Sequence, residues 1–192
     1  LQLEYKKINF VCKRLPRILT EQTNLYHSNS HNSADPVTYM IDLLNLKKQK
    51  NNVYLLSYKN MDFIKKELEN NFKDYKYQIL SCEYNQIEQD IINKDSNLYK
   101  NNPKFIFLIN RIEDILKVEF IDIYYKEFDT LFENYLNLIK NLRKNTSSTI
   151  YINSFHHSFI PITQNYTGNN SIEFLISKYN EKLHKLGKEL SD

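Results

Sequence analysis

Short apolar runs alternate with amphipathic segments from about residue 52 onward, and this rhythm predicts an α/β domain built on a parallel sheet. The most apolar run, 104–110, is suited to burial on both faces and is predicted to be the central strand. The run 76–81 alternates apolar and polar residues, which is typical of an edge strand. Two further strands are predicted at 53–57 and 149–153.

Helices are predicted where apolar residues recur at helical spacing between these strands. The longest covers 123–144, and we interpret its apolar residues as core, not as a cofactor-binding motif. The others are predicted over 63–72, 85–93 and 171–190. The rhythm of the sheet favours a fifth strand after the last helix, and none follows it. We therefore expect the domain to be truncated before its last strand.

The first fifty residues have a different pattern. Leu15-Pro16 interrupts an apolar and basic stretch, and 27–34 is a run of Ser, Asn and His ending in Ala. A helix is then predicted from Asp35, which can cap it, with Pro36 at the first helical position. We therefore predict an N-terminal helical arm and linker over residues 1–34, followed by the α/β domain over 35–192.

Composition and charge exclude several classes of protein. Lys+Arg 26 against Asp+Glu 23 gives a net charge of +3, and the charges alternate along the chain, so a dedicated nucleic-acid binder is disfavoured. No apolar run approaches the roughly 20 residues that span a bilayer, and no signal peptide is evident, so we expect a cytoplasmic protein with no membrane partner. Cys12 and Cys82 are too few for a disulfide scaffold. With only 2 Gly, neither a dinucleotide fingerprint nor a P-loop can form, and no cofactor is predicted in this segment.

Candidate chemistry is expected at the carboxyl ends of the strands, where open α/β sheets bind ligands. Ser57 follows the first of these strands and is a candidate nucleophile, although a serine there is more often a helix cap. Asn85 and Asn110 are candidate oxyanion-side residues by position alone. His157, in the His156-His157 pair, is a candidate base or metal ligand, with a solvated loop as the alternative.

One segment carries a resemblance to a known family. The stretch from Glu83 to Tyr99, followed by Asn102-Pro103 and an apolar strand, resembles the N-terminal region of FkbH-like proteins. That region has an aromatic-Asn-Gln-aromatic motif, then Gln-Glu-Ile and a trailing Asp-x-Ser-x-Leu-Tyr. This chain matches most of it, with Ile87 in place of the second aromatic residue. Ile152-Asn153-Ser154-Phe155 and Tyr179-Asn180-x-x-Leu183 are similar to further motifs, so that the resemblance covers about residues 50–190.

The resemblance implies a three-layer fold like that of flavodoxin or the SGNH hydrolases, with four to five parallel strands. FkbH-like proteins join such a domain to a haloacid-dehalogenase phosphatase domain of subfamily IIIC, which uses an Asp-x-Asp motif and Mg²⁺. The family is implicated in moving a glyceryl unit to an acyl carrier protein thiol in polyketide-type biosynthesis. This chain has no Asp-x-Asp, so Mg²⁺ is expected only in a downstream phosphatase domain. It also lacks the Asp-x-x-His pair that completes an SGNH active site around Ser57.

Three functions follow as hypotheses. The first is an N-terminal domain of an FkbH-like protein, without a complete active site, whose partner is an acyl carrier protein or its own phosphatase domain. A modest basic excess suits an acidic carrier, and it includes Arg14, Arg17, Lys47, Lys48 and Lys50. The alternatives are an SGNH-type esterase or acyltransferase that uses Ser57, and a structural or dimerisation module.

Overall fold

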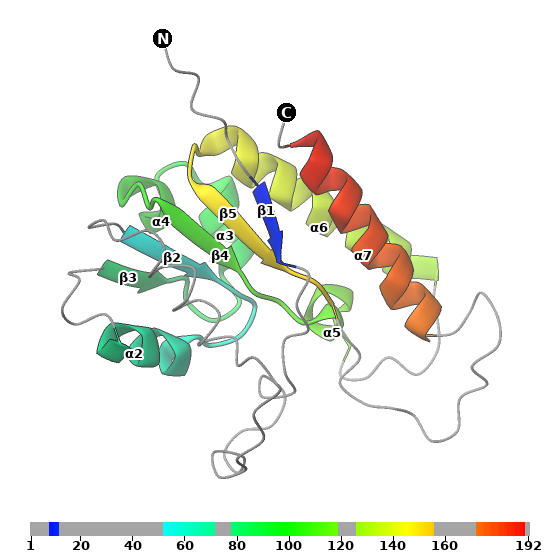
Figure 1. Ribbon diagram of the computed structural model, residues 1–192, viewed down its shortest axis with the longest axis horizontal. Helices are drawn as coiled ribbons and strands as arrows, with labels where there is room; N and C mark the ends of the chain where they lie inside the picture. The colour runs from blue at the N-terminus through cyan, green and yellow to red at the C-terminus, as the bar shows by residue number, and fades with distance from the viewer. Residues whose placement is uncertain (1–7, 12–51, 72–77, 119–125, 156–171, 191–192) are drawn as a thin grey trace.

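The computed structural model describes residues 8–11, 52–71, 78–118, 126–155 and 172–190. These residues form a parallel sheet of five strands in the order β1-β5-β4-β2-β3, with helices on both faces (Figure 1). The predicted α/β class with a parallel sheet is confirmed. The strands are β1 (Ile8–Val11), β2 (Asn52–Leu56), β3 (Gln78–Ser81), β4 (Phe105–Leu108) and β5 (Thr149–Asn153).

The predicted positions of two strands in the sheet are confirmed. β4 lies between β5 and β2, and all four of its residues are buried. A strand in this position is covered on both faces, which explains why its sequence is apolar throughout. β3 lies at one edge of the sheet, and its first residue, Gln78, is exposed.

The expected helical arm is wrong at residues 8–11, which form strand β1 instead. β1 pairs in parallel with β5, with Ile8 opposite Ile150 and Val11 opposite Asn153. The segment Ile-Asn-Phe-Val is rich in β-branched and aromatic residues, which favour extended backbone once a partner strand is available. The fifth strand therefore comes from the N-terminal side of the chain, beside β5. The rest of the expected arm, its boundary at residue 34 and the helix predicted from Asp35 lie outside the described residues.

Six helices connect or follow the strands in the described part of the chain. They are α2 (Asp62–Asn71), α3 (Ile87–Ile92), α4 (Asn97–Lys100), α5 (Ile112–Leu116), α6 (Lys126–Asn145) and α7 (Ile172–Glu189). Four of them lie within a few residues of the predicted helices. The short helices α4 and α5 were not predicted. None of the described helices is long and apolar enough to cross a bilayer.

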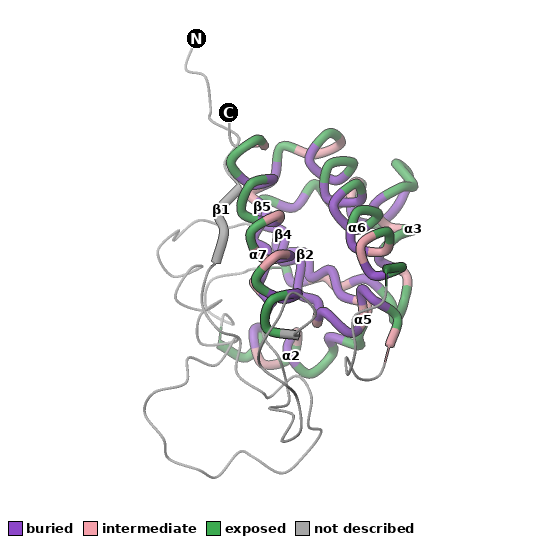
Figure 2. The backbone as a smooth tube through the Cα atoms, turned by 90° about the vertical axis from the view of Figure 1, so that its right-hand side faces the viewer, coloured by how far each residue is buried: buried purple, intermediate pink, exposed green. Residues whose placement is uncertain are grey.

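The two faces of the sheet bury different residues because successive side chains of a strand alternate between them. Tyr54, Ile106 and Ile150 face the larger core, to which α3, α5, α6 and α7 contribute. Val53 and Phe105 face the smaller core with residues of α2. The buried strands lie between these helices, and the outer faces of α6 and α7 are exposed (Figure 2).

Contacts with α7 fix the position of α6 on the larger core. The ring of Phe132 stacks on that of Tyr179, with ring centroids 4.1 Å apart. Beside this stack, the Lys178 ammonium lies 2.9 Å from both carboxylate oxygens of Asp129. Because α7 holds it on one side, α6 presents its other side to α3, and the pocket described below lies between those two helices.

Candidate functional site

The carboxyl ends of four strands are joined to one another by side-chain hydrogen bonds. At the β3 end, the Cys82 thiol lies 3.3 Å from the backbone N–H of Ser57 and donates to the Ser57 carbonyl oxygen, also at 3.3 Å. Next to it, the backbone N–H of Tyr58 donates to Asn110 Oδ1 at 2.8 Å, which joins the β2 end to the β4 end.

The β4 and β5 ends are joined by a pair of amide bonds. Asn153 Oδ1 accepts the backbone N–H of Asn110, and Asn153 Nδ2 donates to the Asn110 carbonyl oxygen, both at 2.9 Å. A side-chain amide thus continues the backbone ladder beyond the last strand residues. Asn180 of α7 repeats this arrangement with the backbone of Phe155, accepting its N–H at 2.8 Å and donating to its carbonyl at 3.0 Å. The carboxyl ends of β3, β2, β4 and β5 are therefore braced by side chains.

Ser57, the candidate nucleophile, is part of this buried brace. It is 2% exposed, and its Oγ accepts the backbone N–H of Lys59 at 3.1 Å. This is the local turn that a serine at a strand end commonly forms. The structure therefore gives Ser57 a structural role, and its role as a nucleophile stays a prediction. His157, the candidate base, lies outside the described residues.

The two asparagines predicted to stabilise an oxyanion differ in burial. Asn110 is 2% exposed, and in addition to its bond with Tyr58 its Nδ2 donates to Tyr135 Oη at 3.3 Å. Its amide is thus already occupied. Asn85 is exposed in the turn after β3, with a φ of 57° in the left-handed region that asparagine tolerates. Among the described contacts none joins Asn85 to Ser57, so the oxyanion role of both asparagines stays a prediction.

The thiol at this edge is protected by its surroundings. Burial raises the pKa of Cys82 to about 11, and the hydrogen bond with the Ser57 backbone only partly offsets this effect. Because the thiolate is the nucleophilic form, a protonated buried thiol is unreactive at neutral pH.

An ion cluster fixes the loop after β2 against α5. Asp114 accepts two bonds from the Arg111 guanidinium, from Nε at 3.1 Å and from the terminal nitrogen at 2.8 Å. Lys59 approaches the same carboxylate at 3.3 Å.

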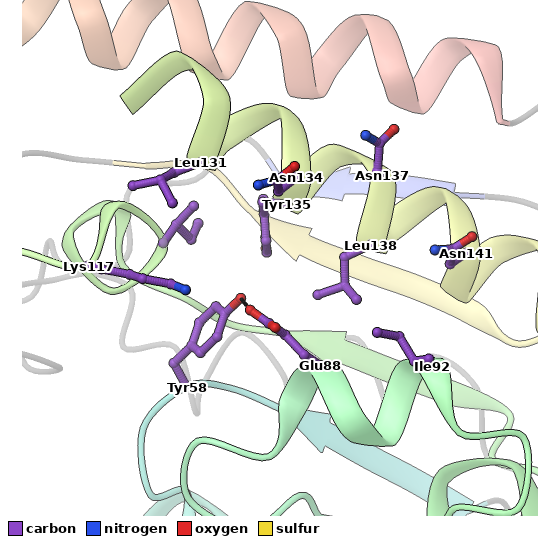
Figure 3. A pocket seen from close by; sticks show the side chains of 11 residues that line it. Tyr58, Glu88, Ile92, Lys117, Leu131, Asn134, Tyr135, Asn137, Leu138 and Asn141 are labelled. Carbon is purple, nitrogen blue, oxygen red and sulfur yellow. Dashed lines mark hydrogen bonds between the residues drawn. The ribbon is translucent and has the colours of Figure 1, made fainter. Parts of the chain in front are cut away.

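A pocket of about 280 Å³ opens beside the braced edge, between α3 and α6 (Figure 3). At one end the Tyr58 hydroxyl donates to Glu88 Oε1 at 3.1 Å, and Lys117 points toward this pair. Along α6, the lining alternates between apolar residues and asparagines: Leu131, Asn134, Tyr135, Asn137, Leu138 and Asn141. Ile92 of α3 and Ile115 of α5 complete it.

Two tyrosines connect this pocket to the core. Burial, reinforced by the charge of Glu88 and the hydrogen bond to it, raises the pKa of Tyr58 above its ordinary value. Burial likewise raises the pKa of Tyr135, which lies between the pocket and Asn110. Both hydroxyls therefore stay protonated at neutral pH and can serve as hydrogen-bond donors. Sequence reasoning missed the pocket because its walls come from helices whose packing the sequence pattern does not specify.

The described residues offer no evident metal site. Among them, no group of three or more His, Cys, Asp or Glu side chains is arranged to hold a metal ion. Asp90, a half-buried acidic residue of α3, accepts a hydrogen bond from the buried Tyr54 hydroxyl at 2.8 Å.

The segment from Glu83 to Tyr99 holds α3 and α4 together. Ser96 Oγ donates to the carbonyl oxygen of Asp90 at 2.7 Å, and the Tyr99 hydroxyl donates to that of Ile91 at 2.6 Å. Leu98 is fully buried in the larger core. The motif residues thus fix α3, and with it one wall of the pocket.

Comparison with known proteins shows a likeness of fold. The chain is similar to the crystal structure of the N-terminal part of the protein BF1531 from Bacteroides fragilis, which contains a phosphatase domain complexed with Mg. The TM-score is 0.61 at 16% sequence identity, and the match covers 80% of this chain and 42% of that chain. This chain therefore spans less than half the length of that crystallised chain. No family model matches the chain. A search of curated proteins found no match either.

Proposed function

We propose that this chain is the N-terminal domain of an FkbH-like protein and that it supports transfer of a glyceryl or acyl unit to an acyl carrier protein. In this proposal the domain binds the carrier and positions it, while the chemistry belongs to a phosphatase-type domain with Mg²⁺ elsewhere in the protein. A complete active site in this segment is not required.

The observation that carries the proposal is the fold shared with BF1531 over 80% of this chain. The N-terminal part of BF1531 contains a phosphatase domain complexed with Mg, and a phosphatase domain with Mg²⁺ is what the resemblance to FkbH-like proteins leads us to expect in the whole protein. The position of the Glu83–Tyr99 motif adds support, because these residues determine how α3 lies on the sheet.

The braced carboxyl edge supports a domain that binds without catalysing. An esterase nucleophile must be reached by its substrate and activated by a base. Ser57 is 2% exposed and its Oγ accepts a backbone hydrogen bond. Cys82 is buried with a raised pKa, so neither group is poised for attack.

Binding to a carrier protein tests the proposal directly. The full chain is immobilised and challenged with its cognate carrier protein, with and without the carrier's prosthetic arm, at low and high salt. We expect binding that weakens as salt increases, because the chain carries a net charge of +3 and carriers are acidic. Absence of binding by either form of the carrier at low salt would overturn the proposal.

An ester-hydrolysis assay separates this proposal from the esterase hypothesis. Activity on short-chain esters is compared between the natural chain and Ser57→Ala. We expect no hydrolysis above background in either protein. A rate that is present in the natural chain and lost in the variant would establish Ser57 as a nucleophile and contradict the non-catalytic role.

A further inference from the structure

The pocket between α3 and α6 follows the length of α6. Its lining on α6 runs from Leu131 to Asn141, a span of about 15 Å at the rise of an α-helix. Its volume of 280 Å³ equals that of about nine water molecules. A site that follows α6 over this length fits a ligand that is an extended chain.

The lining alternates between apolar and amide groups along the same stretch. Leu131 and Leu138 are two turns apart on α6, and Leu138 points toward Ile92 of α3 across the pocket (Figure 3). Asn134, Asn137 and Asn141 lie beside them, and within the described residues no side-chain hydrogen bond is recorded for these three. A side-chain amide both donates and accepts, so this row matches a ligand that carries amide groups on an aliphatic body.

The two ends of the pocket differ in charge. At one end Lys117 points toward the pair of Tyr58 and Glu88, and it forms no ion pair with the described residues. Glu88 holds the Tyr58 hydroxyl, and the Lys117 ammonium is the cationic group in the lining at this end, where it can bind an anionic group of a ligand. The other end, between Ile92 and Asn141, has no charged lining residue. Ile92 is 64% exposed there, so an apolar surface remains open at that end.

We infer that this pocket binds the phosphopantetheine arm of a carrier protein, with the phosphate near Lys117 and the amide-bearing chain along α6. The arm is a linear chain with two amides, one phosphate and an aliphatic portion that carries a hydroxyl and a pair of methyl groups near the phosphate, which is the chemistry that the lining presents. The identity of the partner, a carrier protein, rests on the proposed function. The chemistry of the ligand rests on the pocket alone. The arm binds in this domain, so the carrier is held by its prosthetic group as well as by its surface.

Titration of the full chain with small probes tests the ligand chemistry without the carrier. Pantetheine, phosphopantetheine and a tetra-alanine peptide are each titrated while backbone amide signals are followed by NMR. We expect saturable shifts confined to α3, α5 and α6, with tighter binding for phosphopantetheine than for pantetheine. Equal binding of the peptide at the same signals, or shifts elsewhere only, would overturn the inference.

Variants of the exposed lining residues make the test specific. Asn134→Ala and Asn141→Ala are each expected to weaken both ligands about fivefold, the effect of losing one ordinary hydrogen bond. Asn70→Ala, an exposed asparagine of α2 on the opposite face, is the matched control and is expected to change nothing. Lys117→Met is expected to weaken phosphopantetheine and leave pantetheine unchanged, with Lys126→Met as its control. Equal loss in variant and control would contradict the site.

The carrier itself distinguishes failure of this inference from failure of the proposed function. If the carrier binds equally well with and without its arm and the probes do not bind, the arm site is wrong and the proposed function stands. If the probes bind in the pocket and neither form of the carrier binds, the ligand chemistry stands and the proposed function is wrong.

Discussion

The amide of Asn153 is expected to be a large contributor to stability, and Asn153→Ala measures that contribution. The substitution removes both bonds to Asn110 and leaves the N–H and carbonyl of that buried residue without partners. A buried donor or acceptor left unsatisfied costs about 1–3 kcal/mol. Two such groups predict about 2–6 kcal/mol, and some entry of water at the strand ends favours the lower half, about 3 kcal/mol. That is a large part of the roughly 5–15 kcal/mol that stabilises a domain.

Urea unfolding is the assay, followed by circular dichroism and by tyrosine fluorescence, since the chain has no Trp and 15 Tyr. With a slope of about 2 kcal/mol per molar urea, the midpoint is expected to fall by about 1.5 M. Asn70→Ala, at an exposed position on α2, is the control and is expected to change stability by less than about 0.5 kcal/mol. A loss for Asn153→Ala below about 1 kcal/mol would show that the β4 and β5 ends are not held by this side chain.

Three further predictions concern buried polar groups. Burial raises the pKa of Asp90 in the folded chain above its unfolded value, so the folded state binds the proton more readily and stability falls as pH rises above about 4. Asp90→Asn keeps an acceptor for Tyr54 and does not titrate, so its unfolding free energy is expected to decrease less over this pH range. Parallel pH profiles of the unfolding free energy in the two proteins would contradict this prediction. Burial raises the pKa of Cys82 to about 11, so alkylation at neutral pH, mapped by mass spectrometry, is expected to be slow until urea unfolds the chain; fast native labelling would refute the burial. Arg143→Met removes the guanidinium that donates to the carbonyls of Thr146 and Ser148 after α6, and a loss of about 2–4 kcal/mol is expected in the urea assay; an unchanged midpoint would count against this cap.

The sequence pattern located the strands in the middle of the sheet because strands that are buried on both faces consist almost entirely of apolar residues. The strand predicted at 149–153 is β5 with the same bounds, and 104–110 contains β4. β1 could not be found in this way, because its pairing with β5 joins distant parts of the chain. The short helices α4 and α5 were missed because one turn or so has no measurable period.

The sequence was less informative about the carboxyl edge. It placed Ser57 and Asn110 at strand ends correctly, but it assigned them by analogy with enzymes that use those positions for chemistry. A polar side chain at a strand end can be exposed to solvent or bonded to a neighbouring strand. Which of the two occurs depends on the order of the strands in the sheet, and the sequence pattern does not predict that order. In a sequence so rich in asparagine, Asn153 and Asn180 carried no sign of their bracing roles.

Bracing and catalysis compete for the same atoms at the edge of a parallel sheet. A nucleophile or oxyanion donor must keep a hydrogen-bonding group available to substrate. The Ser57 hydroxyl instead closes a local turn, and the side-chain amides of Asn110 and Asn153 are bonded to the ends of neighbouring strands. A braced edge makes a rigid base, and the nearest available polar groups are then on the helices above it. The pocket between α3 and α6 lies there, with Tyr58 reaching it from the β2 end and Tyr135 from α6. If the brace sets the position of those two residues, Asn153→Ala should weaken pantetheine binding as well as lower stability, even though Asn153 does not line the pocket.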